Sequence, residues 1–389
     1  MNSRELEDRY TLATYPKLPF ALVRGAGSYV FDDAGRRYLD MYGGHAVTSL
    51  GHSHPRWVEA ISRQAAQFDF YSNICYLPIR AEAAERVVRN SYPSMQGVYF
   101  CNSGAEANET ALKMARKLTR RPLVVAMLEG FHGRTIAALS VTGLEKMRQA
   151  FPENLDRLTR FVPMGDLAAI ESLDPSQIAA VILEPILSLG GVRLGTAEYY
   201  QGLRSWCSRH GVALIFDEVQ TGNGRTGKWF VGHHWGVEPD IVTTAKAIAG
   251  GFPVGAVIAN AWVGADVKSG DQGSTFGGGP MAAAAVAATY RVIEEEGLVD
   301  KVARRSAAAM GRFRERIGKS PIREVRGLGY LLGIECDLPA KEVQSRLLKQ
   351  GVFVGTSNHA NTFRLLPPLT VTDEEWDELF AALDKALMA

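Results

Sequence analysis

The sequence is poor in cysteine and contains no closely spaced cysteine pair. Its four cysteines lie far apart along 389 residues, at Cys75, Cys101, Cys207 and Cys336. This spacing argues against a disulfide framework and against a zinc site built from cysteines. We therefore expect free, buried thiols in a reducing compartment.

Metal ligands of other kinds are also scarce. His52 and His54 flank a single residue, but no carboxylate or cysteine lies close to them in the sequence. A role in a loop is therefore the better interpretation, and we predict no metal site.

Basic and acidic residues are nearly equal in number, so the chain has no excess of charge of either sign. The chain has 43 basic and 42 acidic residues, a formal net charge of +1. Such a balance favours a small metabolite over nucleic acid, an anionic membrane or another polyanion. Residues 1–10 are charged and lack the apolar core of a signal peptide, so a cytoplasmic location is expected.

No long hydrophobic run is uninterrupted. The one membrane-like stretch, residues 247–265, is uncharged but is broken by Gly250, Gly251 and Pro253, among others. We interpret it as a turn followed by a buried strand, and we expect no membrane span.

Apolar segments of strand length are plentiful, and from about residue 50 to 260 they alternate with helical patterns. This alternation predicts an α/β fold with a mostly parallel sheet covered by helices on both faces. After residue 280 strands and helices mix again, which indicates a smaller second α/β domain. We predict that residues 1–45 join the small domain, that residues 46–279 form the large domain, and that residues 280–389 complete the small one.

One acid and one lysine stand in unusual settings. The apolar run 212–216 ends at Asp217, and Lys246 follows a second short run, 241–244, among alanines and an isoleucine. Desolvation favours the neutral amine of such a lysine, which can then hold a carbonyl as a Schiff base. A buried carboxylate can keep the ring nitrogen of pyridoxal phosphate protonated. Each residue alone could be a structural feature, but together they indicate this cofactor.

A strand-to-helix junction at residues 101–118 adds a phosphate site. Ser103 and Glu106 have the spacing of a capping box, and Glu109 with Lys113 predicts an ion pair on the outer face of the helix. Gly104, which lacks a Cβ, leaves room for a ligand at the positive end of the helix dipole. A well-capped helix without a ligand is the alternative.

The segment EGFHGRT, residues 129–135, places glycines on both sides of Phe131 and His132. The glycines permit a planar ligand to approach, and an aromatic ring beside it could stack on the ligand's face. A core phenylalanine is the alternative interpretation.

The chain contains the glycine spacing of a dinucleotide-binding motif without the strand and helix that normally flank it. Gly222, Gly224 and Gly227 have the G-x-G-x-x-G spacing, which would suit an NAD(P)-dependent oxidoreductase. The motif does not directly follow a strand, and the residues after it do not start a helix, so this remote alternative lacks its structural context.

Taken together, these segments resemble the class III, or ω-type, aminotransferases of the fold type I pyridoxal phosphate enzymes, and among them the acetylornithine aminotransferase group. The resemblance covers nearly the whole chain. It rests on motifs in the family's order: GGHAVTSLGHSHP, CNSGAEANETALKMAR, EGFHGRT, LEPI, LIFDEVQTGNGRTG, TTAKAIAGGFPVGA, GSTFGG and FRLLPPL.

The resemblance implies roles around pyridoxal 5'-phosphate. Lys246 would bind the cofactor covalently and move protons, and Asp217 would pair with the ring nitrogen. Gln220 would reach the phenolic oxygen, and Val219 would pack under the ring opposite Phe131, next to His132. The phosphate would be held by Ser103, Gly104 and Ala105, joined by Thr275 from a partner subunit, which implies a homodimer with shared sites.

The resemblance also implies a substrate side and a ping-pong reaction. Arg134 and Ser274 would face the α-carboxylate of an acylated diamino acid, and Tyr15 would line the pocket. Arg364 would grip the carboxylate of glutamate or 2-oxoglutarate, a bidentate role that suits a guanidinium. An ω-amino donor would leave as a semialdehyde, and 2-oxoglutarate would become glutamate.

Two departures from the family pattern leave the donor open. Residues 184–191 are EPILSLGG where the family commonly has EPIQGEGG, and residues 278–280 are GGP where it has GGNP. Acetylornithine, ornithine, 4-aminobutyrate, an acylated lysine precursor and an amino sugar are the alternatives. Leu189 replaces a glutamate thought to neutralise the arginine, so Arg364 should stay available in both half-reactions unless another acid replaces that partner. Leu187 and Leu189 also suggest a more apolar donor.

Overall fold

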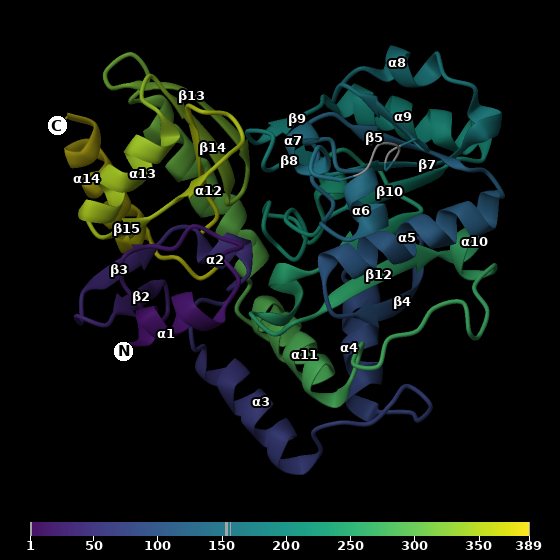
Figure 1. The fold of residues 1–389 in the computed structure, drawn as a ribbon, viewed down its shortest axis with the longest axis horizontal. Coiled ribbons are helices and arrows are strands. Elements are labelled where there is room, and N and C mark those ends of the chain that lie inside the picture. Colours follow the sequence, from purple (N-terminus) through teal and green to yellow (C-terminus); the bar gives the residue numbers. More distant parts are fainter. Residues whose placement is uncertain (1, 152–154, 156, 389) are drawn as a thin grey trace.

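A seven-stranded sheet forms the centre of the larger lobe in the computed structural model, which describes residues 2–151, 155 and 157–388 (Figure 1). Its strands, in spatial order, are β4 (Met95–Cys101), β12 (Gly255–Asn260), β11 (Ile241–Thr244), β10 (Ala213–Asp217), β7 (Ile178–Leu183), β5 (Leu123–Met127) and β6 (Thr159–Val162). β12 runs antiparallel to both of its neighbours, whereas the remaining pairs are parallel. The predicted mostly parallel sheet is therefore confirmed.

Both faces of this sheet are covered, which explains why its strands are continuous apolar runs. Along β5, Val124 and Ala126 pack on the side of α5, whereas Val125 and Met127 pack in the core on the side of α9. The helices of this lobe are α4 (Pro78–Arg89), α5 (Gly104–Thr119), α6 (Ile136–Ser140), α7 (Glu145–Arg148), α8 (Leu167–Glu171), α9 (Ala197–His210) and α10 (Ala261–Gly264). Three short 3-10 helices connect them: η1 (Pro175–Gln177), η2 (Val231–His234) and η3 (Lys246–Ala249).

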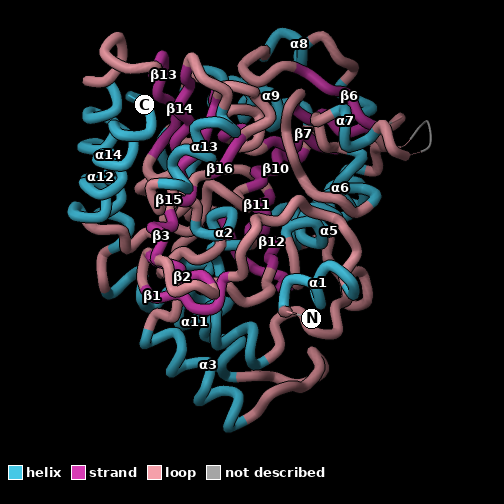
Figure 2. The backbone as a smooth tube through the Cα atoms, turned by 60° about the vertical axis from the view of Figure 1, so that its left-hand side comes forward, coloured by secondary structure: helices cyan, strands magenta, loops and turns pink. Residues whose placement is uncertain are grey.

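The second lobe is built from both ends of the chain. One sheet has the order β1 (Leu22–Ala26), β2 (Tyr29–Asp32), β3 (Arg37–Asp40) and β15 (Val352–Phe353); the other has β13 (Ile322–Leu328), β14 (Leu331–Cys336), β17 (Thr362–Leu365) and β16 (Gly355–Thr356). β15 pairs parallel with β3, and Leu39 shares one apolar core with residues of α12 (Leu298–Arg314), α13 (Ala340–Lys349) and α14 (Asp373–Met388). Figure 2 shows β1 to β3 next to β15. The predicted domain boundaries at residues 45 and 279 remain predictions.

Three further helices and a small ribbon complete the chain between the lobes and at its start. They are α1 (Ser3–Tyr10), α2 (Gly43–Ala46) and α3 (Pro55–Gln67), with β8 (Ile186–Leu187) paired to β9 (Arg193–Leu194). α11 (Pro280–Glu295) packs against both α3 and α4 and contributes to the apolar cores of both lobes. Its alanine-rich sequence permits this close packing on several sides.

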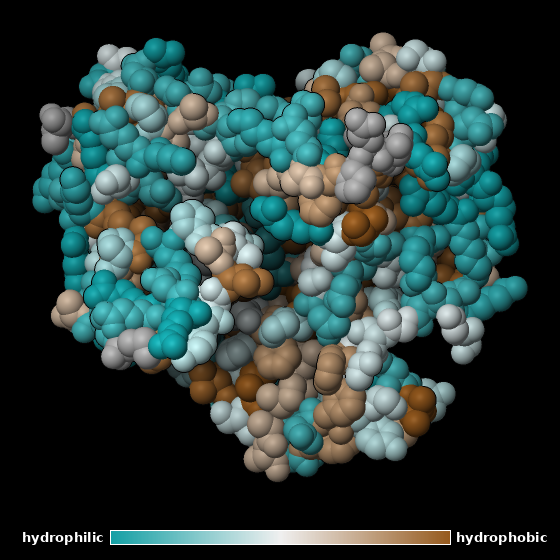
Figure 3. All heavy atoms as spheres, viewed as in Figure 1, coloured by the Kyte–Doolittle hydropathy of each residue, from teal (hydrophilic) through white to brown (hydrophobic). Residues whose placement is uncertain are grey.

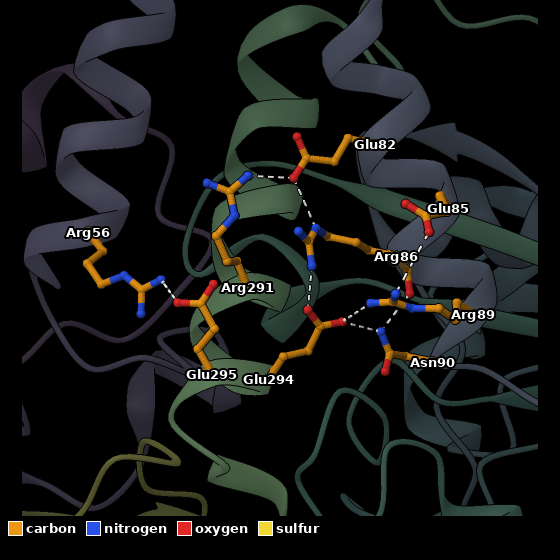
Figure 4. Close-up of polar contacts among 9 residues, drawn as sticks. All are labelled: Arg56, Glu82, Glu85, Arg86, Arg89, Asn90, Arg291, Glu294 and Glu295. Atoms are coloured by element: carbon orange, nitrogen blue, oxygen red, sulfur yellow. Dashed lines mark hydrogen bonds and ion pairs between the residues drawn. The ribbon is translucent and has the colours of Figure 1, made fainter.

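Charged side chains fasten α11 to α4 (Figure 4). Two carboxylates receive most of the bonds: Glu294 accepts from Arg86, from Arg89 at 3.0 Å and from Asn90 at 2.7 Å, and Glu82 accepts from Arg291 and, at 3.0 Å, from Arg86. Arg56 of α3 pairs in turn with Glu295 of α11. The network therefore joins α11 to two helices that lie about 200 positions earlier in the sequence.

The structure corrects two expectations and adds two elements near the start of the chain. Cys75 is exposed, whereas the other three cysteines are buried and all four are free. Glu109 does not pair with Lys113; it accepts the backbone N–H of Ala137 at 2.8 Å, and Lys113 reaches Gln272 at 2.9 Å. The first 26 residues contain α1 and β1, which the sequence patterns did not predict.

No described helix is long and apolar enough to cross a membrane. The described part of the chain also contains no cluster of three or more histidine, cysteine or acidic side chains arranged to hold a metal ion.

Candidate active site

A cavity of about 440 Å³ opens at the carboxyl ends of the central strands. Asp217 ends β10, Glu184 directly follows β7, and Lys246 lies two residues beyond β11, so parallel strands deliver all three side chains to one edge of the sheet. Figure 3 shows this face of the molecule hollowed between the two lobes. Eleven of the predicted site residues line the cavity: Tyr15, Ser103, Gly104, Ala105, Phe131, His132, Arg134, Asp217, Val219, Gln220 and Lys246.

Lys246 is held in a costly backbone conformation. Its φ of 47° lies in the left-handed region, which non-glycine residues seldom adopt. Burial lowers the pKa of its ammonium, and the positive charge of Arg364 lowers it further, although Asp217 and Glu184 act in the opposite direction. The net effect is a lowered pKa, which makes the neutral amine, the form that attacks a carbonyl, easier to reach than in an ordinary lysine.

Asp217 is buried, and three donors hold its carboxylate. Oδ2 accepts from Asn108 Nδ2 and from His132 Nδ1, both at 2.7 Å, and Oδ1 accepts from the backbone N–H of Val219 at 3.1 Å. Asn108 is itself fixed, because its Oδ1 accepts from the Thr243 hydroxyl at 2.6 Å. The motifs did not single out Asn108, although a polar residue on the buried alanine face of α5 is a usable signal.

The start of α5 has the space that a phosphate needs. Ser103 is the N-cap, with Oγ accepting from Glu106 N at 3.2 Å, while the Glu106 carboxylate accepts from Asn102 N at 2.6 Å rather than from Ser103 N. The first hydrogen bond of the predicted capping box is therefore present, whereas the second goes to the backbone N–H one residue earlier. A Cβ on Gly104 would lie 3.0 Å from a methyl group of Val219, so glycine keeps the cavity open here.

Phe131 and Glu184 form the side of the cavity near β7. The carboxylate of Glu184 accepts from Phe131 N at 2.8 Å. Burial, reinforced by the charge of Asp217, raises the pKa of Glu184 to about 7. The guanidinium carbon of Arg134 lies 5.9 Å from the Phe131 ring centre, and its side chain is exposed toward the cavity mouth.

Arg364 lies behind the cavity wall rather than in it. Its guanidinium is only 1% exposed and donates to Thr356 O at 2.8 Å, to Ser188 Oγ at 2.8 Å and to Tyr42 OH at 3.1 Å. Among the described residues no carboxylate makes a hydrogen bond or ion pair with it. Ser188 and Tyr42 were not predicted, because their roles depend on contacts between segments far apart in the sequence.

Two further predicted residues, besides Arg364, lie outside the cavity of their own chain. Ser274 accepts from Asn102 Nδ2 at 3.0 Å and lines a neighbouring hollow together with Asn73 and Tyr76. Thr275 is exposed. In a single subunit, neither residue therefore lines the cavity.

The residues present fit pyridoxal phosphate. His132 Nε2 is buried without a partner among the described residues, Asp217 offers a fixed carboxylate, and Gly104 leaves room at the amides that begin α5. A lysine with a lowered pKa stands in the same cavity. The glycines at 222, 224 and 227 lie in turns that open no helix, so the dinucleotide interpretation has no structural support.

Comparisons with known proteins agree with this geometry. The model of the family "Aminotransferase class-III" matches residues 10–387. An acetylornithine aminotransferase of Methanosarcina acetivorans is 41% identical over 382 residues, covering 98% of this chain and 95% of that protein. One of Bacillus subtilis is 38% identical over 375 residues, covering 96% of each.

A solved structure shares the whole architecture. The ornithine aminotransferase of Toxoplasma gondii, described with partial occupancy of PLP at its active site, superposes with a TM-score of 0.92 at 30% identity, covering 98% of this chain and 93% of that one. The match includes both lobes. The chain belongs to the class III aminotransferases and is a pyridoxal phosphate-dependent enzyme of fold type I.

Proposed function

We propose that this enzyme transfers the ω-amino group of an acylated diamino acid, with acetylornithine as the model donor, to 2-oxoglutarate. The products would be a semialdehyde and glutamate. The observation that carries this proposal is the full-length identity of 38–41% to several acetylornithine aminotransferases. A buried arginine next to the cavity, with no acidic partner in the described chain, supports a carboxylate-bearing substrate.

The proposed division of roles follows from the contacts of each side chain. When bound, the cofactor supplies an electron sink for charge developing at the substrate carbon. Lys246 would accept and return the proton at that carbon, since its environment favours the neutral amine. Asp217 would hold a proton at the ring nitrogen, and Val219 and Phe131 would enclose the two ring faces.

The remaining cofactor contacts are hydrogen bonds. Ser103, Gly104 and Ala105 would bind the phosphate through the hydroxyl and the free amides at the start of α5. Gln220 would donate to the phenolic oxygen, and His132 would support Asp217. On the substrate side, Arg134, Tyr15 and Ser274 would surround the α-carboxylate half of the donor.

The enzyme would act as a homodimer with shared active sites, with Thr275 and Ser274 contributed across the interface. Large apolar side chains are exposed in the segment after α3 and near Thr275: Phe68, Phe70, Tyr71, Ile74, Tyr76 and Phe276. Figure 3 shows apolar surface around α3 at the lower end of the molecule. Such a patch is typical of a protein–protein interface. The cytoplasm is the proposed compartment, in keeping with four free cysteines.

A different ω-amino donor is the second candidate. Leu189 lines the cavity with Val47 and Tyr15, so this part of the wall is more apolar than the family pattern with glutamate at that position. Ornithine, 4-aminobutyrate, an acylated lysine precursor or an amino sugar would then replace acetylornithine.

An amino-donor panel tests the proposal. Each candidate donor is offered with 2-oxoglutarate, and glutamate formation is measured. Acetylornithine or another acylated diamino acid should give the highest kcat/KM, with Lys246→Ala as the inactive control. If a non-acylated amine is preferred by tenfold or more, the proposed donor class is wrong, and the second candidate takes its place.

A further inference from the structure

A buried serine connects the two lobes at the active site. Ser188 follows β8 and has no exposed surface. Its Oγ lies 2.8 Å from Arg364 Nη1 and 2.5 Å from Gln220 Oε1. Arg364 belongs to β17 of the smaller lobe, whereas Gln220 lines the cavity in the larger one. One hydroxyl therefore joins a buried cation to an amide in the cavity wall.

The direction of this chain of hydrogen bonds is fixed by chemistry. A guanidinium can only donate, so Ser188 Oγ must accept from Arg364. The serine's own proton then goes to Gln220, which must present its amide oxygen to Ser188. The amide N–H₂ group of Gln220 is left for an acceptor in the cavity.

The guanidinium of Arg364 has more N–H donors than the described residues use. Of the five N–H groups of a guanidinium, three have acceptors among the described residues, one each in Thr356, Ser188 and Tyr42. Since these bonds use Nε, Nη1 and Nη2 once each, one N–H remains on each terminal nitrogen. That pair matches the two oxygens of a carboxylate. All three partners are neutral, so none of them competes for the charge as an acidic side chain would.

We propose that Ser188 is a positioning residue that aims both Arg364 and Gln220. It fixes one terminal nitrogen of Arg364 so that the free N–H pair faces a substrate carboxylate, and it holds the Gln220 amide with its donors toward the cofactor. Because the hydroxyl is neutral, Arg364 stays open to a carboxylate throughout the reaction. This inference rests on the proposed role of Arg364 and adds a residue to it.

The test uses the cofactor-loaded enzyme and glutarate, an unreactive dicarboxylate. In Ser188→Ala, calorimetry should show glutarate binding weakened by about tenfold, the typical effect of losing one hydrogen bond to a charged group. The absorption of the bound cofactor should also titrate at higher pH, because the Gln220 amide is then free to turn its oxygen inward. A merely structural serine would not change that titration.

Matched variants separate the loss of this hydroxyl from a general effect of changing a buried serine. Ser306→Ala removes another buried hydroxyl, one that bonds only its own helix at Ala303 O, and should bind glutarate as the wild type does. Ser188→Thr keeps the hydroxyl and should retain most of the affinity. Wild-type glutarate binding and cofactor titration in Ser188→Ala, or an equal loss in Ser188→Thr, would overturn the inference. Arg364→Ala separates the two claims: if it also binds glutarate normally, the proposed role of Arg364 fails as well.

Discussion

At the scale of single residues, the site combines buried ionisable groups that receive unequal numbers of hydrogen bonds. Asp217 receives three hydrogen bonds, whereas Glu184 receives one, from Phe131 N. Burial raises the pKa of Glu184 to about 7 and lowers that of Lys246. Near neutral pH Glu184 can therefore exchange its proton, and Lys246 gives up its proton more easily than an ordinary lysine does.

Removing the lysine tests this arrangement. Lys246→Ala should reduce transamination by at least about a thousandfold, because no other described amine is placed to attach the cofactor or move the proton. Dialysis should then remove the cofactor, as followed by absorbance. The exposed Lys228→Ala is the matched control and should leave both properties unchanged. Retained activity and retained covalent attachment in Lys246→Ala would refute the role of this residue.

Leu189 offers a test of how Arg364 is kept available. Leu189→Glu places a carboxylate in the cavity wall near Arg364, whose bonds in the described chain are all to neutral groups. The new acid should compete with the substrate carboxylate, a contact worth about 1.5–3 kcal/mol. We expect kcat/KM for glutamate to fall about tenfold or more relative to that for the ω-amino donor.

The neutral variant Leu189→Gln separates charge from size. It should change the ratio of the two kcat/KM values far less than Leu189→Glu does. An unchanged ratio in the glutamate variant would mean that residue 189 does not govern the exchange of substrates.

The residues expected to contact the cofactor were easier to predict than the residues that hydrogen-bond and position other site residues. Lys246, Asp217 and Gln220 stand in short motifs whose residue types suit one cofactor, and the structure brings them into one cavity. Ser188 and Tyr42 had no such signal, since each acts through Arg364, about 180 and 320 positions away by the hydrogen bonds that link them. Local sequence cannot encode a partner that only the folded chain supplies.

At the scale of elements, apolar periodicity predicted the buried parts and failed at the edges. The central strands are buried on both faces, so their apolar runs were plain in the sequence. α1 has no buried residue and β1 is mostly exposed, and hence neither has a strong pattern. Glu109 and Lys113 had the spacing of a helical ion pair, yet stronger tertiary partners took both side chains.

The ion-pair network between α4 and α11 should contribute to stability. Although burial acts to raise it, hydrogen bonds from Arg291 and Arg86 lower the pKa of Glu82 below its usual value of 4.5. Ionised Glu82 therefore stabilises the folded state above about pH 4.5, and this contribution is lost as the pH falls below that value. Glu82→Gln should cost about 1 kcal/mol of unfolding free energy at pH 7.

Urea denaturation at several pH values measures this cost. Glu85→Gln is the control, because Glu85 contacts Arg89 only at 3.8 Å and its side chain is 65% exposed. We expect no measurable loss in the control, and a loss for Glu82→Gln that shrinks in acid. A loss independent of pH would show that packing, and not charge, accounts for the effect.

At the scale of the whole molecule, Ser274 and Thr275 lie outside the cavity of their own chain. The residues that line the cavity run from Tyr15 to Val254, so its walls combine the start of the chain with the larger lobe, which Figure 1 shows beside the smaller lobe. Yet Thr275 is exposed and Ser274 faces a neighbouring hollow. Under the proposed dimer, the local motif GSTFGG cannot tell which copy of the chain these residues would serve, because that depends on how two subunits would meet.

Subunit exchange decides whether Thr275 acts across an interface. Lys246→Ala and Thr275→Ala should each be inactive or strongly impaired alone. In a mixed dimer, the subunit with intact Lys246 receives an intact Thr275 from its partner, so one of its two sites is restored. With random exchange of equal amounts, half of the dimers are mixed, and about one quarter of the wild-type activity should return.

A second pair of variants makes this result specific. Arg364 bonds Ser188 of its own chain, and hence belongs to the site of its own subunit. Mixing Lys246→Ala with Arg364→Ala should therefore restore nothing, because each site still lacks one residue. If native mass spectrometry verifies exchange and the Thr275 pair also stays inactive, Thr275 does not act in trans and the shared-site dimer is refuted. Recovery in the Thr275 pair alone places the phosphate site at the subunit boundary, so that dissociation would abolish activity without unfolding either chain.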